Sequence, residues 1–174
     1  LFVFVVEISF GPPVIISVER STDDESRMYV YFDFETVSGG GEKAEVKLFD
    51  SEMREIDSKT VGRSRKNEKK TFFKPSSSGT YYIEVLGIRG DEEISSGVYE
   101  IVWTYPLFSP VASAVNQGDN SIRLSWNEIK EADGYLVRMN GEEYRTEECE
   151  MIFSGLQSGV KYSFSVSSIR KDEI

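Results

Sequence analysis

Histidine is absent from this sequence of 174 residues, and cysteine occurs only once. The missing imidazole excludes Ser-His-Asp and Cys-His nucleophile systems, histidine-ligated zinc and histidine acid–base catalysis. The single cysteine excludes a disulfide within the chain. Cys149 lies among Glu147, Glu148 and Glu150, and we interpret it as incidental rather than catalytic.

Positive charge and long apolar runs are also scarce. No run approaches the roughly 20 apolar residues that a membrane-spanning helix needs. The formal net charge is −10, and phosphate binding needs a basic face, so we expect neither a nucleic-acid partner nor an anionic membrane surface. The one basic cluster, at residues 63–70, is interpreted as a solvated loop, with contact to a polyanion as the alternative.

Motifs for phosphate, metal and paired-carboxylate chemistry are missing too. The glycines at 39–41 are not followed by the Lys-Ser/Thr pair of a phosphate loop. The acidic clusters at 23–25 and 91–93 lack the spacing of a calcium loop, and we expect them to be solvated. The other acids lie in loops of modules too small for a glycosidase cleft. We therefore predict no enzyme activity, no cofactor and no metal site.

The chain does contain many short segments in which apolar and polar residues alternate. Period-two alternation is typical of a strand with one buried and one solvated face. The segments are separated by turn signals, and no helical stripe interrupts them. Hydrophobic residues make up 39% of the chain and aromatics 13%, enough for a packed core. This pattern predicts an all-β sandwich.

The stretch at residues 156–166 is the most informative of these segments. Gly159 supplies a turn, and Tyr162, Phe164 and Val166 then alternate with serines. A tyrosine at such a corner buries its ring while its hydroxyl bonds to nearby backbone. We therefore expect a tyrosine corner at Tyr162, followed by a half-buried strand.

The second half of the chain resembles the fibronectin type III family. The resemblance covers residues 110–170 and depends on three motifs in the family's order, which are Ser125-Trp126, Ala132-Asp133-Gly134-Tyr135 and Leu156-x-x-Gly159-x-x-Tyr162. The first half is a fainter copy, in which Ser78-Gly79-Thr80-Tyr81 parallels the corner and Phe34 takes the place of the tryptophan. The first module is thus similar to fibronectin type III or to another immunoglobulin-like sandwich.

The resemblance implies two tandem Greek-key β-sandwich modules. We expect an apolar strand or signal remnant at residues 1–11, a first module at 12–105, a linker at 106–110 and a second module at 111–174. The second module lacks its last strand. Either the chain is a fragment, or the edge stays open, or another chain supplies the strand. Self-association through residues 1–10, from Leu1 to Phe10, is one form of the last alternative.

Two sets of residues are candidate binding sites. Arg89, Gly90 and Asp91 fall between the sixth and seventh expected strands, where the tripeptide looks like the integrin-binding loop of an animal fibronectin module. Tyr29, Tyr31 and Tyr82, with Phe49, are expected to point away from the core. A row of these aromatics suits stacking on sugar rings or on another protein.

These observations predict a non-catalytic module pair that binds or spaces proteins outside the cell or in the cell envelope. The alternative is a glycan-recognising accessory module of a secreted polysaccharide-degrading enzyme. A strand-donating subunit of a surface assembly is a minor alternative. The fold itself hosts many roles and does not choose among these.

Overall fold

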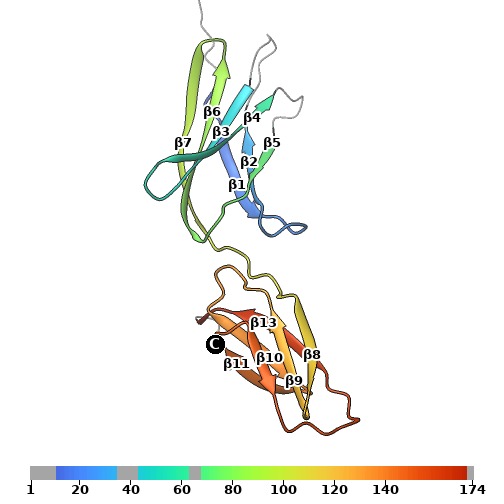
Figure 1. Cartoon of the computed structure of the whole chain (residues 1–174). Helices are drawn as coiled ribbons and strands as arrows, with labels where there is room; N and C mark the ends of the chain where they lie inside the picture. The colour runs from blue at the N-terminus through green and yellow to red at the C-terminus, as the bar shows by residue number, and fades with distance from the viewer. Residues whose placement is uncertain (1–10, 35–42, 63–67, 172–174) are drawn as a thin grey trace, which may run out of the picture. The chain divides into compact units, whose positions relative to one another are not determined.

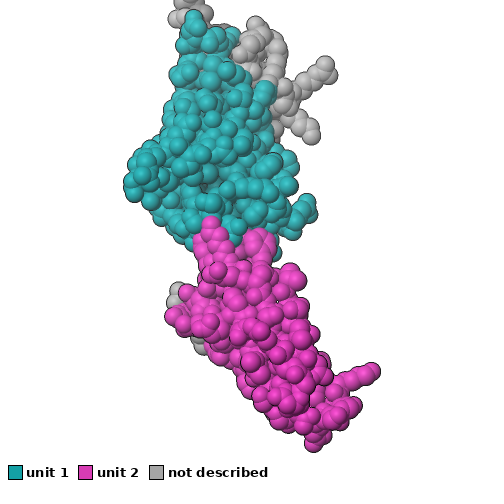
Figure 2. Space-filling model, viewed as in Figure 1, with its two compact units in different colours: residues 1–105 teal, residues 106–174 magenta. Residues whose placement is uncertain are grey.

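The computed structural model describes residues 11–34, 43–62 and 68–171. Two compact units divide the chain, Leu1–Tyr105 and Pro106–Ile174, shown in different colours in Figure 2. Thirteen strands and no α-helix occur in the described residues, which confirms the all-β prediction. No helix in this part of the chain is long and apolar enough to span a membrane.

Unit 1 consists of two antiparallel sheets (Figure 1). The first has the order β1-β2-β5 and comprises β1 (Val14–Arg20), β2 (Met28–Asp33) and β5 (Glu68–Phe73). The second has the order β4-β3-β6-β7 and comprises β3 (Lys43–Phe49), β4 (Glu55–Gly62), β6 (Gly79–Arg89) and β7 (Glu92–Trp103). The sheets face each other, because β1 contacts β7 at one edge and β4 contacts β5 at the other.

The core of unit 1 follows from strand alternation. Val30 and Phe32 on β2 are fully buried, as are Ile83 and Val85 on β6, while the residues between them point outward. Phe34, which takes the place of the tryptophan that the second module has at Trp126, is also buried in this core. Alternate residues of facing sheets thus form one apolar layer.

The basic cluster at residues 63–70 is not wholly a solvated loop, and that expectation is wrong for Lys69. The strand β5 begins at Glu68, and its pleat turns Lys69 inward, where the side chain is only 5% exposed. The ammonium donates a hydrogen bond of 2.8 Å to the Phe34 carbonyl oxygen, which satisfies the buried charge. Residues 63–67 lie outside the described part of the chain.

Unit 2 is built from two three-stranded sheets. One has the order β12-β9-β8, with β8 (Ala112–Gly118), β9 (Ser121–Trp126) and β12 (Glu150–Phe153). The other has the order β11-β10-β13, with β10 (Gly134–Met139), β11 (Glu142–Thr146) and β13 (Phe164–Ile169). The buried core residues are Leu124, Trp126, Ile129, Tyr135, Val137 and Phe153.

Turns set the starts of two strands. β7 starts at Glu92, because the two-residue turn at Gly90 and Asp91 lets pairing with β6 begin at once. β13 starts at Phe164, after the corner that contains Tyr162.

Candidate functional site: an aromatic face on unit 1

Three aromatic side chains lie together on the outer face of the β1-β2-β5 sheet. Tyr29 and Tyr31 alternate with the buried Val30 on β2, so their rings project away from the core. The register places Phe72 of β5 directly beside Tyr29. The ring centroids lie 6.1 Å apart for Tyr29 and Tyr31, and 5.7 Å apart for Tyr29 and Phe72. These separations are within the range of favourable aromatic pairs.

Two cations complete this face. The Lys70 ammonium lies 5.1 Å from the ring centroid of Tyr29 and 5.8 Å from that of Tyr31. The Arg27 guanidinium lies 4.9 Å from the Phe72 centroid. Each distance is within the reach of a cation–π interaction. We call Tyr29, Tyr31, Phe72, Arg27 and Lys70 the aromatic ladder.

The loop that contains Asp24 contacts the aromatic ladder at Arg27. Asp24 lies 3.1 Å from the Arg27 Nε and accepts a hydrogen bond of 2.9 Å from the Lys74 ammonium. Its carboxylate also accepts bonds from the Ser26 hydroxyl and backbone N–H. The Ser26 hydroxyl, followed by Lys74, lowers the pKa of Asp24 to about 2. The expected solvated acidic loop therefore makes specific contacts within unit 1.

Tyr82 and Phe49 do not belong to the ladder, although the sequence suggested a single row. They are register partners on β6 and β3, in the other sheet of unit 1. The outer faces of two packed sheets point in opposite directions, which separates these rings from Tyr29 and Tyr31. A hydrogen bond with Glu100 raises the pKa of Tyr82. Conversely, sequence reasoning missed Phe72, Arg27 and Lys70, since only strand pairing shows that they adjoin Tyr29.

Arg89, Gly90 and Asp91 lie at the hairpin between β6 and β7. Arg89 pairs with Glu92 across the hairpin, which leaves Gly90 and Asp91 as a two-residue turn. The φ of Gly90 is +60°, and a glycine with positive φ at the first central position is typical of a type II′ turn. Gly90 and Asp91 are exposed. The expected loop is thus a tight turn.

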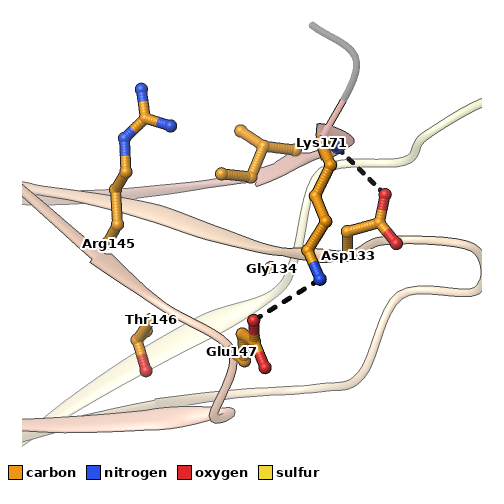
Figure 3. A pocket seen from close by; sticks show the side chains of 7 residues that line it. Asp133, Gly134, Arg145, Thr146, Glu147 and Lys171 are labelled. Atoms are coloured by element: carbon orange, nitrogen blue, oxygen red, sulfur yellow. Dashed lines mark hydrogen bonds and ion pairs between the residues drawn. The ribbon is translucent and has the colours of Figure 1, made fainter. Parts of the chain in front are cut away.

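A shallow hollow of about 350 Å³ lies on unit 2 (Figure 3). Gly134 forms part of its lining and adds no side chain there. The Lys171 ammonium lies 3.7 Å from a Glu147 carboxylate oxygen, and the Lys171 backbone N–H donates to Asp133 at 3.0 Å. Because Lys171 and Glu147 pair with each other in this lining, we assign the hollow no chemistry. Among the described residues, no cluster of Asp, Glu and Cys side chains could hold a metal ion.

Both units contain a tyrosine corner. The Tyr162 hydroxyl accepts a hydrogen bond of 2.9 Å from the Gln157 backbone N–H, as predicted. In unit 1 the Tyr81 hydroxyl donates to the Ser77 carbonyl oxygen, also at 2.9 Å. Each bond links a tyrosine near the start of a strand to the turn before it, the device found at a Greek-key corner.

Comparisons with known proteins agree with this geometry. Residues 109–173 match the family described as Fibronectin type III domain. The chain is similar to a two-domain fibronectin type III segment from chicken tenascin, with 14% identity, a TM-score of 0.56 and coverage of 92% of each chain. Chicken interferon gamma receptor alpha chain matches at 12% identity and a TM-score of 0.39, over 94% of this chain and 84% of that chain. No curated protein matches the chain.

The tenascin similarity concerns the fold alone, whereas the family match concerns the sequence of unit 2. The strand orders, the two corners and the family match agree on one assignment. Residues 109–173, within unit 2, are similar in sequence to the fibronectin type III domain, and the chain as a whole has a tandem β-sandwich fold similar to that of the tenascin segment.

Proposed function

We propose that this chain is a non-catalytic pair of protein-binding and spacing modules that works outside the cell or at its surface. Domains of the family matched by unit 2 commonly bind or space proteins. The lack of histidine supports a non-catalytic role. The observation that carries the binding role is the aromatic ladder on the β1-β2-β5 sheet.

The ladder has the composition of a protein-binding surface. Tyrosine, phenylalanine and arginine are enriched at protein interfaces, and tyrosine and arginine are common among the strongest contacts there. The side chains of Tyr29, Tyr31 and Arg27 are half-buried, and Phe72 is 37% exposed. Because neighbouring rings and cations already restrain these side chains, binding a partner costs little additional conformational entropy.

The test compares variants on the two outer faces of unit 1. Tyr31→Thr and Phe72→Thr remove ladder rings while keeping good strand residues, and Tyr82→Thr is the matched control on the other sheet. Each chain is measured against panels of purified cell-surface proteins and soluble glycans. We expect a protein ligand whose binding falls about tenfold or more in the ladder variants only. Equal loss in Tyr82→Thr, or no loss in the ladder variants, contradicts the proposal.

Glycan recognition is the second candidate, and the row of tyrosine rings favours it. Sugar recognition of this kind stacks a ring of the glycan on an exposed aromatic face. Here Lys70 lies against Tyr29 and Tyr31, and Arg27 lies against Phe72, so a sugar competes with cations for these rings. Specific retention by a soluble glycan, lost in Tyr31→Thr, selects the accessory-module function over the protein-binding one.

Cell attachment through Arg89, Gly90 and Asp91 is a separate and weaker proposal. The exposed hairpin turn supports it, because the aspartate projects at the end of β6 and β7. Asp91→Glu keeps the charge but moves the carboxylate by one methylene. Equal attachment of integrin-bearing cells to both proteins excludes this role.

A further inference from the structure

The Lys70 ammonium lies on the aromatic ladder without a counter-ion. It contacts the rings of Tyr29 and Tyr31, and its side chain is exposed. Among the described residues, no carboxylate lies within ion-pair distance of this ammonium, and no oxygen accepts a hydrogen bond from it. A lysine ammonium carries three hydrogen-bond donors and no acceptor. Lys70 therefore offers a positive charge and free donors to a ligand.

The tyrosine hydroxyls of the ladder are also without a partner. Tyr29 and Tyr31 form no hydrogen bond with any residue in the part of the chain that the structure describes. By contrast, four other tyrosine hydroxyls are hydrogen-bonded within the chain, namely those of Tyr81, Tyr135, Tyr144 and Tyr162. Both ladder rings contact the same Lys70 ammonium, so the unsatisfied groups gather in one region of the face.

The other charges near this region are already paired. Asp24 lies 3.1 Å from the Arg27 Nε and accepts a hydrogen bond of 2.9 Å from the Lys74 ammonium. On β1, the Glu19 carboxylate accepts a hydrogen bond of 2.8 Å from the Ser17 hydroxyl. Lys70 is thus the cation of this face whose charge a ligand can neutralise.

These groups favour a carboxylate as the ligand. A carboxylate has two acceptor oxygens, so it can accept from the ammonium and from a tyrosine hydroxyl together. A hydrogen bond between charged groups is stronger than one between neutral groups. A dianionic phosphate suits the face less well, because Asp24 and Glu19 lie nearby and the chain has a net charge of −10. A neutral sugar leaves the Lys70 charge unpaired.

An apolar surface lies beside the ammonium at a defined spacing. The register places Lys70 opposite Tyr31, and Phe72 opposite Tyr29 two residues further along the strands. Phe72 is 37% exposed, so its ring can pack against a ligand. Two residues of a strand span about 7 Å, which is also the distance between alternate side chains of an extended ligand. One side chain of such a ligand can reach Lys70 while the next on the same face reaches Phe72.

We propose that the aromatic ladder recognises an extended acidic segment of another protein, in which Asp or Glu lies two positions from a large apolar residue. The carboxylate pairs with the Lys70 ammonium, and the apolar side chain packs on the rings of Phe72 and Tyr29. The rings supply most of the affinity, whereas the charge pair supplies specificity and speeds association. This inference rests on the proposed protein-binding function and names the class of its partner.

Peptides in matched acid and amide forms provide the first half of the test. Each immobilised peptide carries Glu two positions from Phe, with the other positions varied, and its twin carries Gln in place of Glu. The full chain is passed over both forms, and the two dissociation constants are compared. We expect the acid form of the peptides that bind to hold the chain about tenfold more tightly than its twin.

Lysine variants provide the second half. Lys70→Gln removes the charge from the ladder, and Lys43→Gln makes the same change at an exposed position on β3, in the other sheet of unit 1. We expect Lys70→Gln to bind acid and amide twins equally, because the peptide carboxylate has lost its partner. Lys43→Gln should keep the full preference for the acid form. Lys70→Arg keeps the charge and should also prefer the acid form.

The outcomes separate this inference from the proposed function. If Tyr31→Thr weakens binding of both twins while Lys70→Gln keeps the preference for the acid form, the ladder binds peptides but Lys70 does not read the carboxylate, and this inference alone fails. It also fails if the unaltered chain retains no acid peptide more tightly than its amide twin. Self-association that Lys70→Gln abolishes, measured by light scattering, assigns the ladder to a second copy and overturns the inference. A protein ligand whose binding ignores Tyr31→Thr and Phe72→Thr overturns both.

Discussion

Replacing Gly87 by alanine should destabilise unit 1 through a steric clash with Phe34. Gly87 lies on the inward face of β6, opposite Ala44 of β3. A Cβ atom at Gly87 would lie 2.4 Å from Cε2 and 2.8 Å from Cζ of the Phe34 ring. Such contacts are far inside van der Waals distance. The ring is 1% exposed and cannot move into solvent without leaving the core.

The magnitude follows from overpacking. Inserting a methyl group into a closed core costs about 1–3 kcal/mol, and the backbone of Gly87 is not in the left-handed region, so sterics account for the cost. Phe34→Leu removes the ring atoms that clash. The double variant should therefore recover part of the loss, with a coupling energy of about 1–2 kcal/mol.

The assay uses the two tryptophans of the chain, one in each core. In a Trp126→Phe background, Trp103 fluorescence reports urea unfolding of unit 1. Gly62→Ala is the control, because its Cβ would meet nothing within 4 Å. The steric explanation is refuted if the unfolding free energy of Gly87→Ala lies within about 0.5 kcal/mol of that of its parent. It is also refuted if the effects of Gly87→Ala and Phe34→Leu on the unfolding free energy simply add in the double variant.

Three further predictions concern a corner, a loop and a hairpin. Tyr162→Phe removes the hydroxyl that accepts from Gln157, and should lower the unfolding free energy of unit 2 by about 1 kcal/mol; an unchanged urea midpoint contradicts this. In the folded protein the pKa of Asp24 is lowered from 3.8 to about 2, mainly by the hydrogen bond from Ser26. The ionised carboxylate therefore stabilises the fold at pH values above the pKa of the unfolded state, and this stabilisation is lost as the pH falls through the pKa of the folded state. Asp24→Asn should therefore reduce the drop in Tm between about pH 5 and about pH 2, and an equal drop in both proteins argues against this linkage. Gly141 has a φ of +94° in the β10–β11 turn, so Gly141→Ala should destabilise unit 2 by about 1 kcal/mol in urea unfolding, and a neutral result means that the turn rearranges at no cost.

Part of the candidate site could be predicted from the sequence. Tyr29 and Tyr31 alternate with a run of core residues, and this local pattern alone indicates that they face outward. The prediction that Tyr82 lies in the same row is wrong, and the sequence did not indicate that Phe72 belongs to it. Both errors have one cause, because sheet membership depends on which strands pair, and alternation does not specify partners. The pairing of β2 with β5 is a contact between residues far apart in the chain.

The sequence by itself determined the all-β class, the positions of most strands and the Tyr162 corner. These features follow from alternation and turn chemistry, which act over a few neighbouring residues. Tertiary structure alone decided that Lys69 is buried, that Phe34 lies over Gly87 and that cations line the ladder. Those outcomes depend on register and on the packing of two sheets. Both are set by long-range contacts, and a short stretch of sequence contains only one side of each contact.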